Sequence, residues 1–137
     1  MLNDEKINQL IKSKAGEDFA RGYWFYGVII KKPIYESWIA VVINEYYLVS
    51  ITEKRIHLYR LGLIGESVHF TAIPMQDAKE IKVSNWMFGF GKRINIRLGD
   101  GQTIKLKAAN RPIGIKEQEF NLLKLEQLYG KSDYKFK

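Results

Sequence analysis

Residues 93–108, RINIRLGDGQTIKLKA, constrain the fold more than any other part of the chain. Apolar and polar residues alternate in both halves, and a Gly-Asp-Gly turn joins them, which predicts a β-hairpin. Side chains of a strand point alternately to its two faces, so one face is apolar and the other carries cations. The apolar set is Ile94, Ile96, Leu98, Ile104 and Leu106, and the opposite set is Arg93, Arg97, Lys105 and Lys107. The chain therefore forms a half-buried antiparallel sheet with a positive outer face.

Length and composition are those of one ordinary globular domain. The chain has 137 residues, of which 46% are hydrophobic and 27% charged, enough to bury a core without disulfides or metals. Cysteine is absent, which excludes disulfides, thiolate metal sites and cysteine nucleophiles and fits a reducing compartment. No secretory signal is visible in MLNDEKINQL, and the apolar runs are too short to span a membrane. We therefore expect a soluble, cytoplasmic protein.

Basic residues outnumber acidic ones, and the excess is concentrated in the middle of the chain. The formal net charge is +7, and residues 46–110 hold ten Lys or Arg against five Asp or Glu. Such a balance favours contact with an anionic surface, such as nucleic acid, anionic lipid or an acidic protein. The alternative is a surface charge that only keeps the protein soluble.

Short runs rich in β-branched and aromatic residues follow one another from residue 37 onward, separated by turn residues. We expect strands at residues 37–43, 46–52, 55–61, 68–73 and 78–83, followed by the two strands of the hairpin. Asn44 and Glu45 form the first turn. Seven short strands at regular spacing predict a mainly β fold, either a small sandwich or a barrel.

One helix is expected before the strands and one after them. Residues 3–14 begin with Asn3 as an N-cap and place their apolar residues on one stripe. Residues 115–129 are apolar over a wide face, so this helix packs on the sheets. The expected organisation is an N-terminal helix and aromatic segment at 1–36, a β domain at 37–130 and a tail at 131–137.

Residues 19–36 are aromatic-rich and ambiguous, and a strand near residues 23–31 is favoured over a helical turn. The strands at 37–43 and 46–52 are apolar on both faces, although a barrel interior covers only one face. Because exposed apolar patches are unusual in monomers, the N-terminal segment is expected to cover the other face. A homo-oligomer is the alternative.

Seven strands followed by one C-terminal helix is an order that resembles bacterial pleckstrin-homology (PH)-like and GRAM-like domains. Local sequences carry the same resemblance. They are the Thr-x-x-Arg turn in TEKRI from Thr52 to Ile56, Ile73 and Pro74 followed by Ile81 and Val83, and the run from Phe88 to Ile96 with the Gly101 hairpin. The resemblance covers residues 37–130.

This resemblance implies a seven-stranded, partly open barrel of two antiparallel sheets, capped by the C-terminal helix. Domains of this kind bind phosphoinositides, peptides or other proteins. Those that bind phosphoinositides use a Lys- and Arg-rich loop between strands one and two, whereas the turn at Asn44 and Glu45 lacks both residue types. This departure argues against phosphoinositide binding at the usual site.

The first candidate site is the set of cations on the outer face of the hairpin, joined by a lysine of the preceding strand. Phosphate groups or anionic lipid headgroups could bind there. The set comprises Lys82, Arg93, Arg97, Lys105 and Lys107. The simpler interpretation, which we favour, is a solvated sheet face whose lysines discourage pairing with other strands.

The second candidate site is the loop before the hairpin, with Trp86, Phe88 and Phe90 beside Lys92 and Arg93. Aromatic residues next to basic ones are typical of membrane-interface contacts. The competing interpretation, which we favour at this stage, is that the three aromatic side chains plug the end of the barrel while glycines allow the bend.

Other chemistry is disfavoured by what the sequence lacks. The outward positions of the hairpin carry no aromatic residue on which a base could stack, which argues against nucleic acid. His57 and His69 stand alone, without a metal-binding motif around them. No nucleophile elbow or phosphate-binding loop is present, so we expect no catalytic residue, metal or cofactor.

The sequence therefore predicts a non-catalytic interaction module that binds a protein or a second copy of itself, with no evident small-molecule substrate. The alternative is a peripheral binder of anionic membrane surfaces that uses the basic sheet face.

Overall fold

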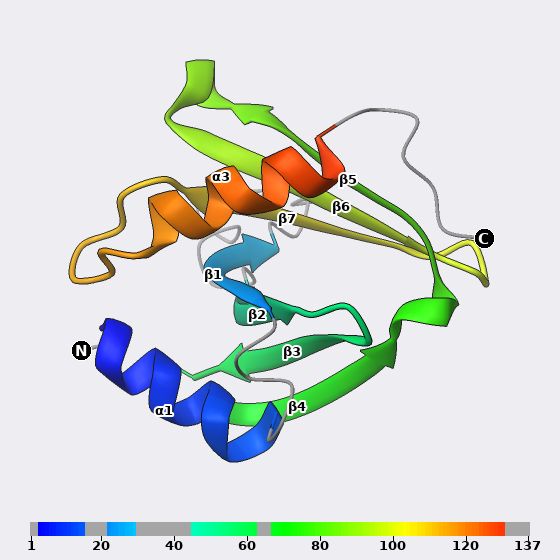
Figure 1. Cartoon of the computed structure of the whole chain (residues 1–137), viewed down its shortest axis with the longest axis horizontal. Helices are drawn as coiled ribbons and strands as arrows, with labels where there is room; N and C mark the ends of the chain where they lie inside the picture. Colours follow the sequence, from blue (N-terminus) through cyan, green and yellow to red (C-terminus); the bar gives the residue numbers. More distant parts are fainter. Residues whose placement is uncertain (1–2, 16–21, 30–44, 63–66, 131–137) are drawn as a thin grey trace, which may run out of the picture.

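The computed structural model describes residues 3–15, 22–29, 45–62 and 67–130. Two helices and seven strands make up most of these residues (Figure 1). In chain order the helices and strands are α1 (Asp4–Ala15), β1 (Tyr23–Ile29), β2 (Glu45–Ile51), β3 (Arg55–Leu61), β4 (Ser67–Pro74), β5 (Ala78–Trp86), β6 (Gly91–Leu98), β7 (Thr103–Ala109) and α3 (Gln118–Tyr129). Short 3-10 turns, η2 (Met75–Asp77) and η3 (Met87–Gly89), precede and follow β5.

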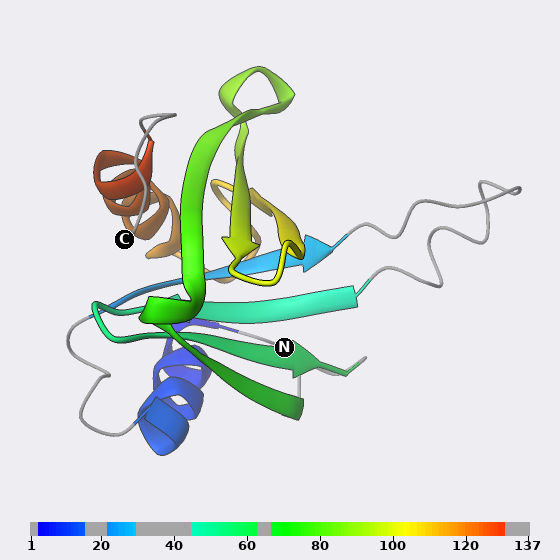
Figure 2. The ribbon, with the colours of Figure 1, turned by 90° about the vertical axis from the view of Figure 1, so that its right-hand side faces the viewer.

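All seven strands belong to one antiparallel sheet in the order β4-β3-β2-β1-β7-β6-β5. The sheet is not closed, because β4 and β5 lie at its two ends. A single register pair, Val28 with Lys107, joins β1 to β7, and the strands on either side of this junction cross one another steeply (Figure 2). The predicted mainly β, partly open fold with seven strands and a C-terminal helix is confirmed, with the two expected sheets joined at β1 and β7.

The first strand of the sheet is β1, which confirms the strand favoured near residues 23–31, whereas the predicted order of seven strands began at residue 37. Glu45 is the first residue of β2 and pairs with Ile29, so Asn44 and Glu45 do not connect strands one and two. That connection is residues 30–44, which include Lys31 and Lys32. The predicted turn at Asn44 and Glu45 is therefore wrong, and its lack of Lys and Arg is no reason to disfavour phosphoinositide binding. The strand predicted at 37–43 lies outside the described residues, and the sheet takes in a strand that precedes the expected domain start at residue 37.

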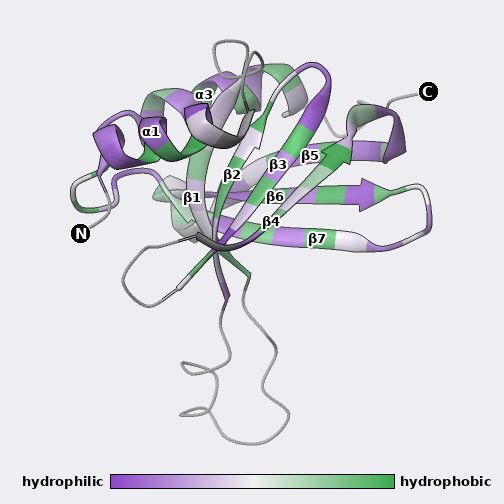
Figure 3. Ribbon diagram, turned by 90° about the horizontal axis from the view of Figure 1, so that it is seen from below, coloured by the Kyte–Doolittle hydropathy of each residue, from purple (hydrophilic) through white to green (hydrophobic). Residues whose placement is uncertain are grey.

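The main core lies between the sheet and α3. Strand residues alternate between hydrophobic and hydrophilic types, as the two faces of a half-buried sheet require (Figure 3). From α3, this core takes Leu122, Leu125 and Tyr129. From the sheet it takes, among others, Phe25, Val49, Ile56, Ile81, Val83, Ile94, Ile96 and Leu106.

A second apolar cluster lies on the opposite face of the sheet, under α1. Ile7 and Ile11 of α1 are 0% and 1% exposed and pack with Trp24, Leu48 and Tyr59. On this face α1 therefore covers Leu48 of β2. The Asn3 cap is confirmed, because the Asn3 side-chain oxygen accepts the Lys6 amide at 2.9 Å.

The turn between β2 and β3 shows why a threonine stands in the sequence TEKRI. The Thr52 hydroxyl accepts hydrogen bonds from the backbone amides of Lys54 at 3.2 Å and Arg55 at 3.0 Å. It also donates to the Arg55 carbonyl at 3.2 Å. One side chain therefore satisfies the polar groups of a tight, half-buried turn.

Gln118, the first residue of α3, holds the two halves of the sheet together. By continuation of the Val28–Lys107 register, Tyr26 lies opposite Ala109, where the strands have separated. The fully buried Gln118 carboxamide fills this gap. Its oxygen accepts the Tyr26 amide at 2.6 Å, and its nitrogen donates to the carbonyls of Tyr26 at 2.9 Å and Ala109 at 2.8 Å. The Gln118 side chain thus takes the place of a backbone hydrogen-bonded pair between β1 and β7.

The helix α3 begins three residues later than the predicted 115–129, because Ile115 belongs to a turn and packs in the second cluster. Asp4 of α1 ties the two helices together, since its carboxylate accepts the amides of Lys116 at 2.7 Å and Glu117 at 2.8 Å. In the described parts of the chain, no helix is long and apolar enough to cross a membrane. The predicted tail at 131–137 lies outside the described residues.

Burial of Tyr59 predicts a loss of stability at alkaline pH. Burial raises the pKa of Tyr59 from 10.0 to about 12, so the unfolded chain loses this proton first. Tyr59 therefore does not affect the free energy of unfolding below about pH 10. Between the two pKa values it lowers this free energy by about 1.4 kcal/mol per pH unit. We expect Tyr59→Phe to remove this part of the alkaline decline in urea unfolding.

Near neutral pH the same variant should be at least as stable as the parent, because the hydroxyl has no hydrogen-bond partner among the described residues. An unchanged alkaline decline in Tyr59→Phe would show that another group causes it.

Candidate functional site

The five predicted cations lie on the outer face of β5, β6 and β7, the face turned away from the main core. We call this set, Lys82, Arg93, Arg97, Lys105 and Lys107, the basic face. Strand register determines which members are neighbours: Arg93 pairs with Lys107, and Asn95 stands between Lys82 and Lys105. Lys107 is half-buried and the other four cations are exposed.

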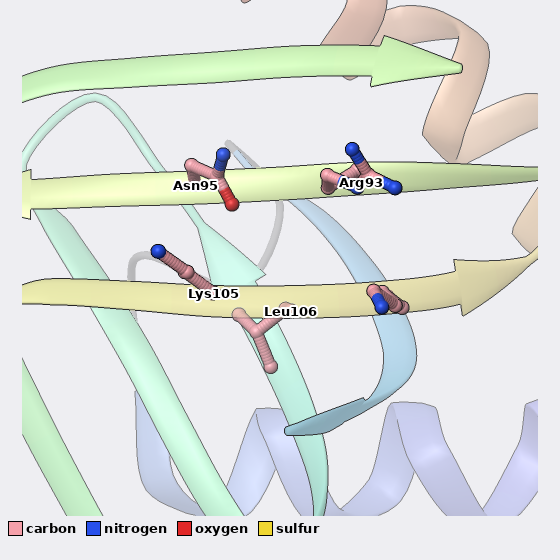
Figure 4. Close-up of a pocket in the computed structure, with 5 residues that line it drawn as sticks. Arg93, Asn95, Lys105 and Leu106 are labelled. Atoms are coloured by element: carbon pink, nitrogen blue, oxygen red, sulfur yellow. The ribbon is translucent and has the colours of Figure 1, made fainter. Parts of the chain in front are cut away.

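A shallow depression of about 280 Å³ opens on this face. Arg93, Asn95, Lys105, Leu106 and Lys107 line it. Arg93 and Asn95 rise from β6 and Lys105 from the adjacent β7 (Figure 4). The Asn95 side-chain oxygen is buried and has no hydrogen-bond partner among the described residues. Three cations, Arg93, Lys105 and Lys107, therefore border a hollow that is wide enough for a small anionic group.

Charge on the basic face is uneven along the strands. Glu80 stands opposite Arg97 in the ladder between β5 and β6, so a carboxylate lies next to the cation farthest from the β5–β6 turn. Within the described part of the chain, no ion pair within 4.0 Å involves any of the five cations. Uncompensated positive charge is therefore concentrated near Lys82, Arg93, Lys105 and Lys107.

Trp86 belongs to this face and not to the barrel interior. Its ring lies over Gly91, where an added Cβ would come within 2.7 Å of the ring. The Lys107 Nζ lies 5.6 Å from the ring centroid, in cation–π geometry. Trp86 reaches this face from β5. The outward positions of β6 and β7, taken alone, therefore do not reveal an aromatic side chain on the face.

The turn between β5 and β6 exposes two aromatic side chains. We call η3 together with Phe90 the hairpin tip. Phe88 is 103% exposed and Phe90 is 75% exposed. The interpretation that Trp86, Phe88 and Phe90 plug the barrel is therefore wrong, because β5 runs three residues past the predicted end of its strand and carries the turn beyond the core.

Two contacts fix the hairpin tip in place. The backbone amide of Asn110, just after β7, donates to the Phe90 carbonyl at 3.0 Å, and its side-chain nitrogen donates to the Gly89 carbonyl at 2.8 Å. Phe88 has φ of 58°, a left-handed conformation that is rare for a bulky residue and persists only where the surroundings hold it. The tip is therefore a held turn that displays its aromatic side chains.

On the inner side of the same hairpin, Lys92 anchors β6 to α3. Its side chain is almost fully buried, and its Nζ donates to the Asn85 side-chain oxygen at 2.6 Å and the Glu126 carboxylate at 2.7 Å. Lys92 is thus internally paired and takes no part in the basic face. Its contacts hold the tip end of the hairpin against α3.

The two histidines lie on different strands, β3 and β4. His57 is 2% exposed and packs near Tyr59 and Phe70, while His69 is exposed on β4. Among the described residues, no three His, Asp or Glu side chains are grouped as a metal site would require.

Comparison with known proteins places the chain in a family. The family model described as "Bacterial PH domain" matches residues 1–113. No curated protein matches. Among solved structures, the hSac2 domain from human phosphoinositide phosphatase Sac2 is similar, with a TM-score of 0.48 and 12% identity over 93% of this chain and 82% of that chain. A similarity this low does not support a conclusion about function.

PH-like domains are typically non-catalytic modules that mediate protein or lipid interactions. The family match takes in α1 and all of the strands, well over half of the chain. The chain therefore belongs to the bacterial PH domain family.

Proposed function

We propose that this domain binds anionic membrane surfaces peripherally, through the basic face. The observation that carries the proposal is the position of four cations with no described ion-pair partner, Lys82, Arg93, Lys105 and Lys107, on three adjacent strands next to the exposed aromatic turn between β5 and β6. Each Lys or Arg near an anionic leaflet contributes about 1 kcal/mol of attraction. A group of four is therefore sufficient for reversible binding.

Two details favour a lipid surface over a merely solvated face. Positive charge on this face gathers toward the hairpin tip, whereas the far end places Glu80 beside Arg97. Trp86, at the border between the cations and the tip, is of the residue type that is enriched at membrane–water interfaces. Charge, interfacial aromatic and exposed apolar side chains thus follow one another along one hairpin.

Sedimentation with vesicles tests the proposal. We expect the protein to pellet with phosphatidylcholine vesicles that contain phosphatidylserine and to remain in solution with phosphatidylcholine alone. Binding should weaken strongly between low salt and about 0.15 M, because ions screen exposed charges. Equal binding to both vesicle types, or none to either at low salt, would rule the proposal out.

A second candidate function, binding of a protein or of a second copy, is favoured by α3. Three apolar side chains on its outer side are 57%, 47% and 49% exposed, namely Phe120, Leu123 and Leu128. A helix that is apolar on all sides is usually covered on all sides, so a partner could cover this one. Sedimentation equilibrium should then detect a dimer, and Leu123→Glu should shift it to monomer. A monomer over the whole concentration range would exclude self-association.

A further inference from the structure

A second exposed apolar residue lies on the connection between β7 and α3, which leaves the sheet at the same end of β6 and β7 as the hairpin tip. The chain leaves β7 at Asn110, which bonds to the tip, and turns back toward α3 through Ile113 and Gly114 (Figure 1). Ile113 is 82% exposed. Exposed apolar groups on two separate turns therefore lie on either side of Asn110.

The backbone holds Ile113 outward. The Ile115 amide donates to the Pro112 carbonyl at 3.2 Å, closing a turn with Ile113 and Gly114 at its corners. Gly114 has φ of 81°, which the third position of a type II turn requires and which glycine adopts without strain. The buried Ile115 anchors the turn below. Ile113 is displayed by a tight, anchored turn in the same way that Phe88 is displayed by the tip.

Cations flank both turns. Arg93 and Lys107 follow the tip along β6 and β7, and Arg111 and Lys116 precede and follow Ile113 in the sequence. The Arg111 side chain is 82% exposed and is ion-paired with Glu119 at 3.2 Å, so among the described residues Lys116 supplies the unpaired charge beside this turn. Apolar side chains at the leading edge with cations just behind them match the two layers of an anionic leaflet, hydrocarbon below and phosphate above. An acidic protein surface would satisfy the cations but would leave the apolar groups in contact with carboxylates.

We propose that Phe88, Phe90 and Ile113 enter the anionic leaflet together, so that the end of the domain carrying both turns faces the bilayer. This inference rests on the proposed function and adds the depth and orientation of binding to it. Insertion makes part of the affinity independent of salt, because transfer of apolar surface from water is not screened by ions.

Single-cysteine probes test the insertion directly, and the absence of natural cysteines makes labelling specific. An environment-sensitive fluorophore would be attached to Phe88→Cys, to Ile113→Cys and, as a control, to Asp100→Cys in the exposed turn between β6 and β7. With phosphatidylserine-containing vesicles, we expect a blue shift at the first two positions and quenching by nitroxide-labelled acyl chains, with no change at Asp100→Cys. Pelleting would be measured in the same samples.

The outcomes separate the two proposals. Pelleting with no shift at either probe would overturn insertion and leave the basic face as the binding surface. A shift at Phe88→Cys alone would overturn the joint insertion of two turns. Failure of every variant and of the parent to pellet would overturn the proposed function, and insertion with it.

A substitution pair gives an independent measure. Asparagine tolerates the left-handed conformation of residue 88, so Phe88→Asn with Phe90→Ser should keep the fold while removing both rings. We expect vesicle affinity to fall ~10-fold or more, at low and at high salt alike. The matched control, Phe120→Ser with Leu123→Ser, removes two exposed apolar groups from α3 and should leave affinity unchanged. Equal losses in both pairs would contradict insertion at the tip.

Discussion

Reversal of two neighbouring charges, Arg93→Glu with Lys107→Glu, should reduce affinity for phosphatidylserine-containing vesicles by ~30-fold or more, because each cation near the leaflet contributes about 1 kcal/mol. The two side chains face each other across the ladder between β6 and β7, beside the shallow depression. Neither forms an ion pair within the described part of the chain, so the exchange breaks no salt bridge there. Vesicle pelleting at low salt measures the effect.

The matched control for this pair changes the net charge equally at a distance from the face. Lys12 on α1 and Lys54 in the turn between β2 and β3 are exposed. Lys12→Glu with Lys54→Glu should therefore weaken binding only slightly, through the long-range field of the protein. If the two pairs lose affinity equally, binding follows net charge and the basic face has no special part in it.

Gln118→Leu should destabilise the domain by about 4 kcal/mol, since three backbone groups that bond to the buried carboxamide lose their partners at about 1–3 kcal/mol each. Those groups are the Tyr26 amide and the carbonyls of Tyr26 and Ala109. They lie where β1 and β7 separate, so the loss falls on the junction between the two halves of the sheet. Urea unfolding measures the change, and the exposed Gln127→Leu on the same helix should stay within about 0.5 kcal/mol of the parent.

A second variant at residue 118 distinguishes lost hydrogen bonds from poor packing. Gln118→Glu keeps an acceptor for the Tyr26 amide but places a carboxylate against two carbonyl oxygens. Its pKa should be raised in the folded state, so this variant should gain stability as the pH falls, when protonation restores a donor. Stability that is independent of pH, or a small loss in Gln118→Leu, would show that the carboxamide does not bridge the strands.

The hairpin and its basic face could be predicted because both depend on local pattern. Alternation of side chains from Arg93 onward assigns each residue to a face, and the turn at Gly101, where φ is 92°, fixes the register. The hairpin pattern therefore assigns Arg93, Arg97, Lys105 and Lys107 to one face, and Lys82 is added from the preceding strand. Their closeness to Trp86 came from pairing between β5 and β6, which no local pattern encodes.

Where prediction failed, long-range contacts decide the structure. The local sequence assigns Glu45 to a turn, yet it begins β2 and pairs with Ile29 of β1, 16 residues earlier in the chain. Phe88 and Phe90 are of a residue type that is usually buried. They lie beyond the core because β5 extends to Trp86. Gln118 is a polar residue at the start of a helix, and its partners on Tyr26 lie 92 residues away in the sequence.

The most direct test of membrane binding through this end of the domain is a map of which residues approach the bilayer. Amide NMR signals of the isotopically labelled protein on phosphatidylserine-containing nanodiscs would be compared with and without a lipid that carries a nitroxide at its headgroup. We predict the strongest broadening at Gly89, Phe90 and Ile113, then at Arg93, and little broadening in β3 and β4. Uniform broadening along the chain, or the strongest broadening in β3 and β4, would contradict the account.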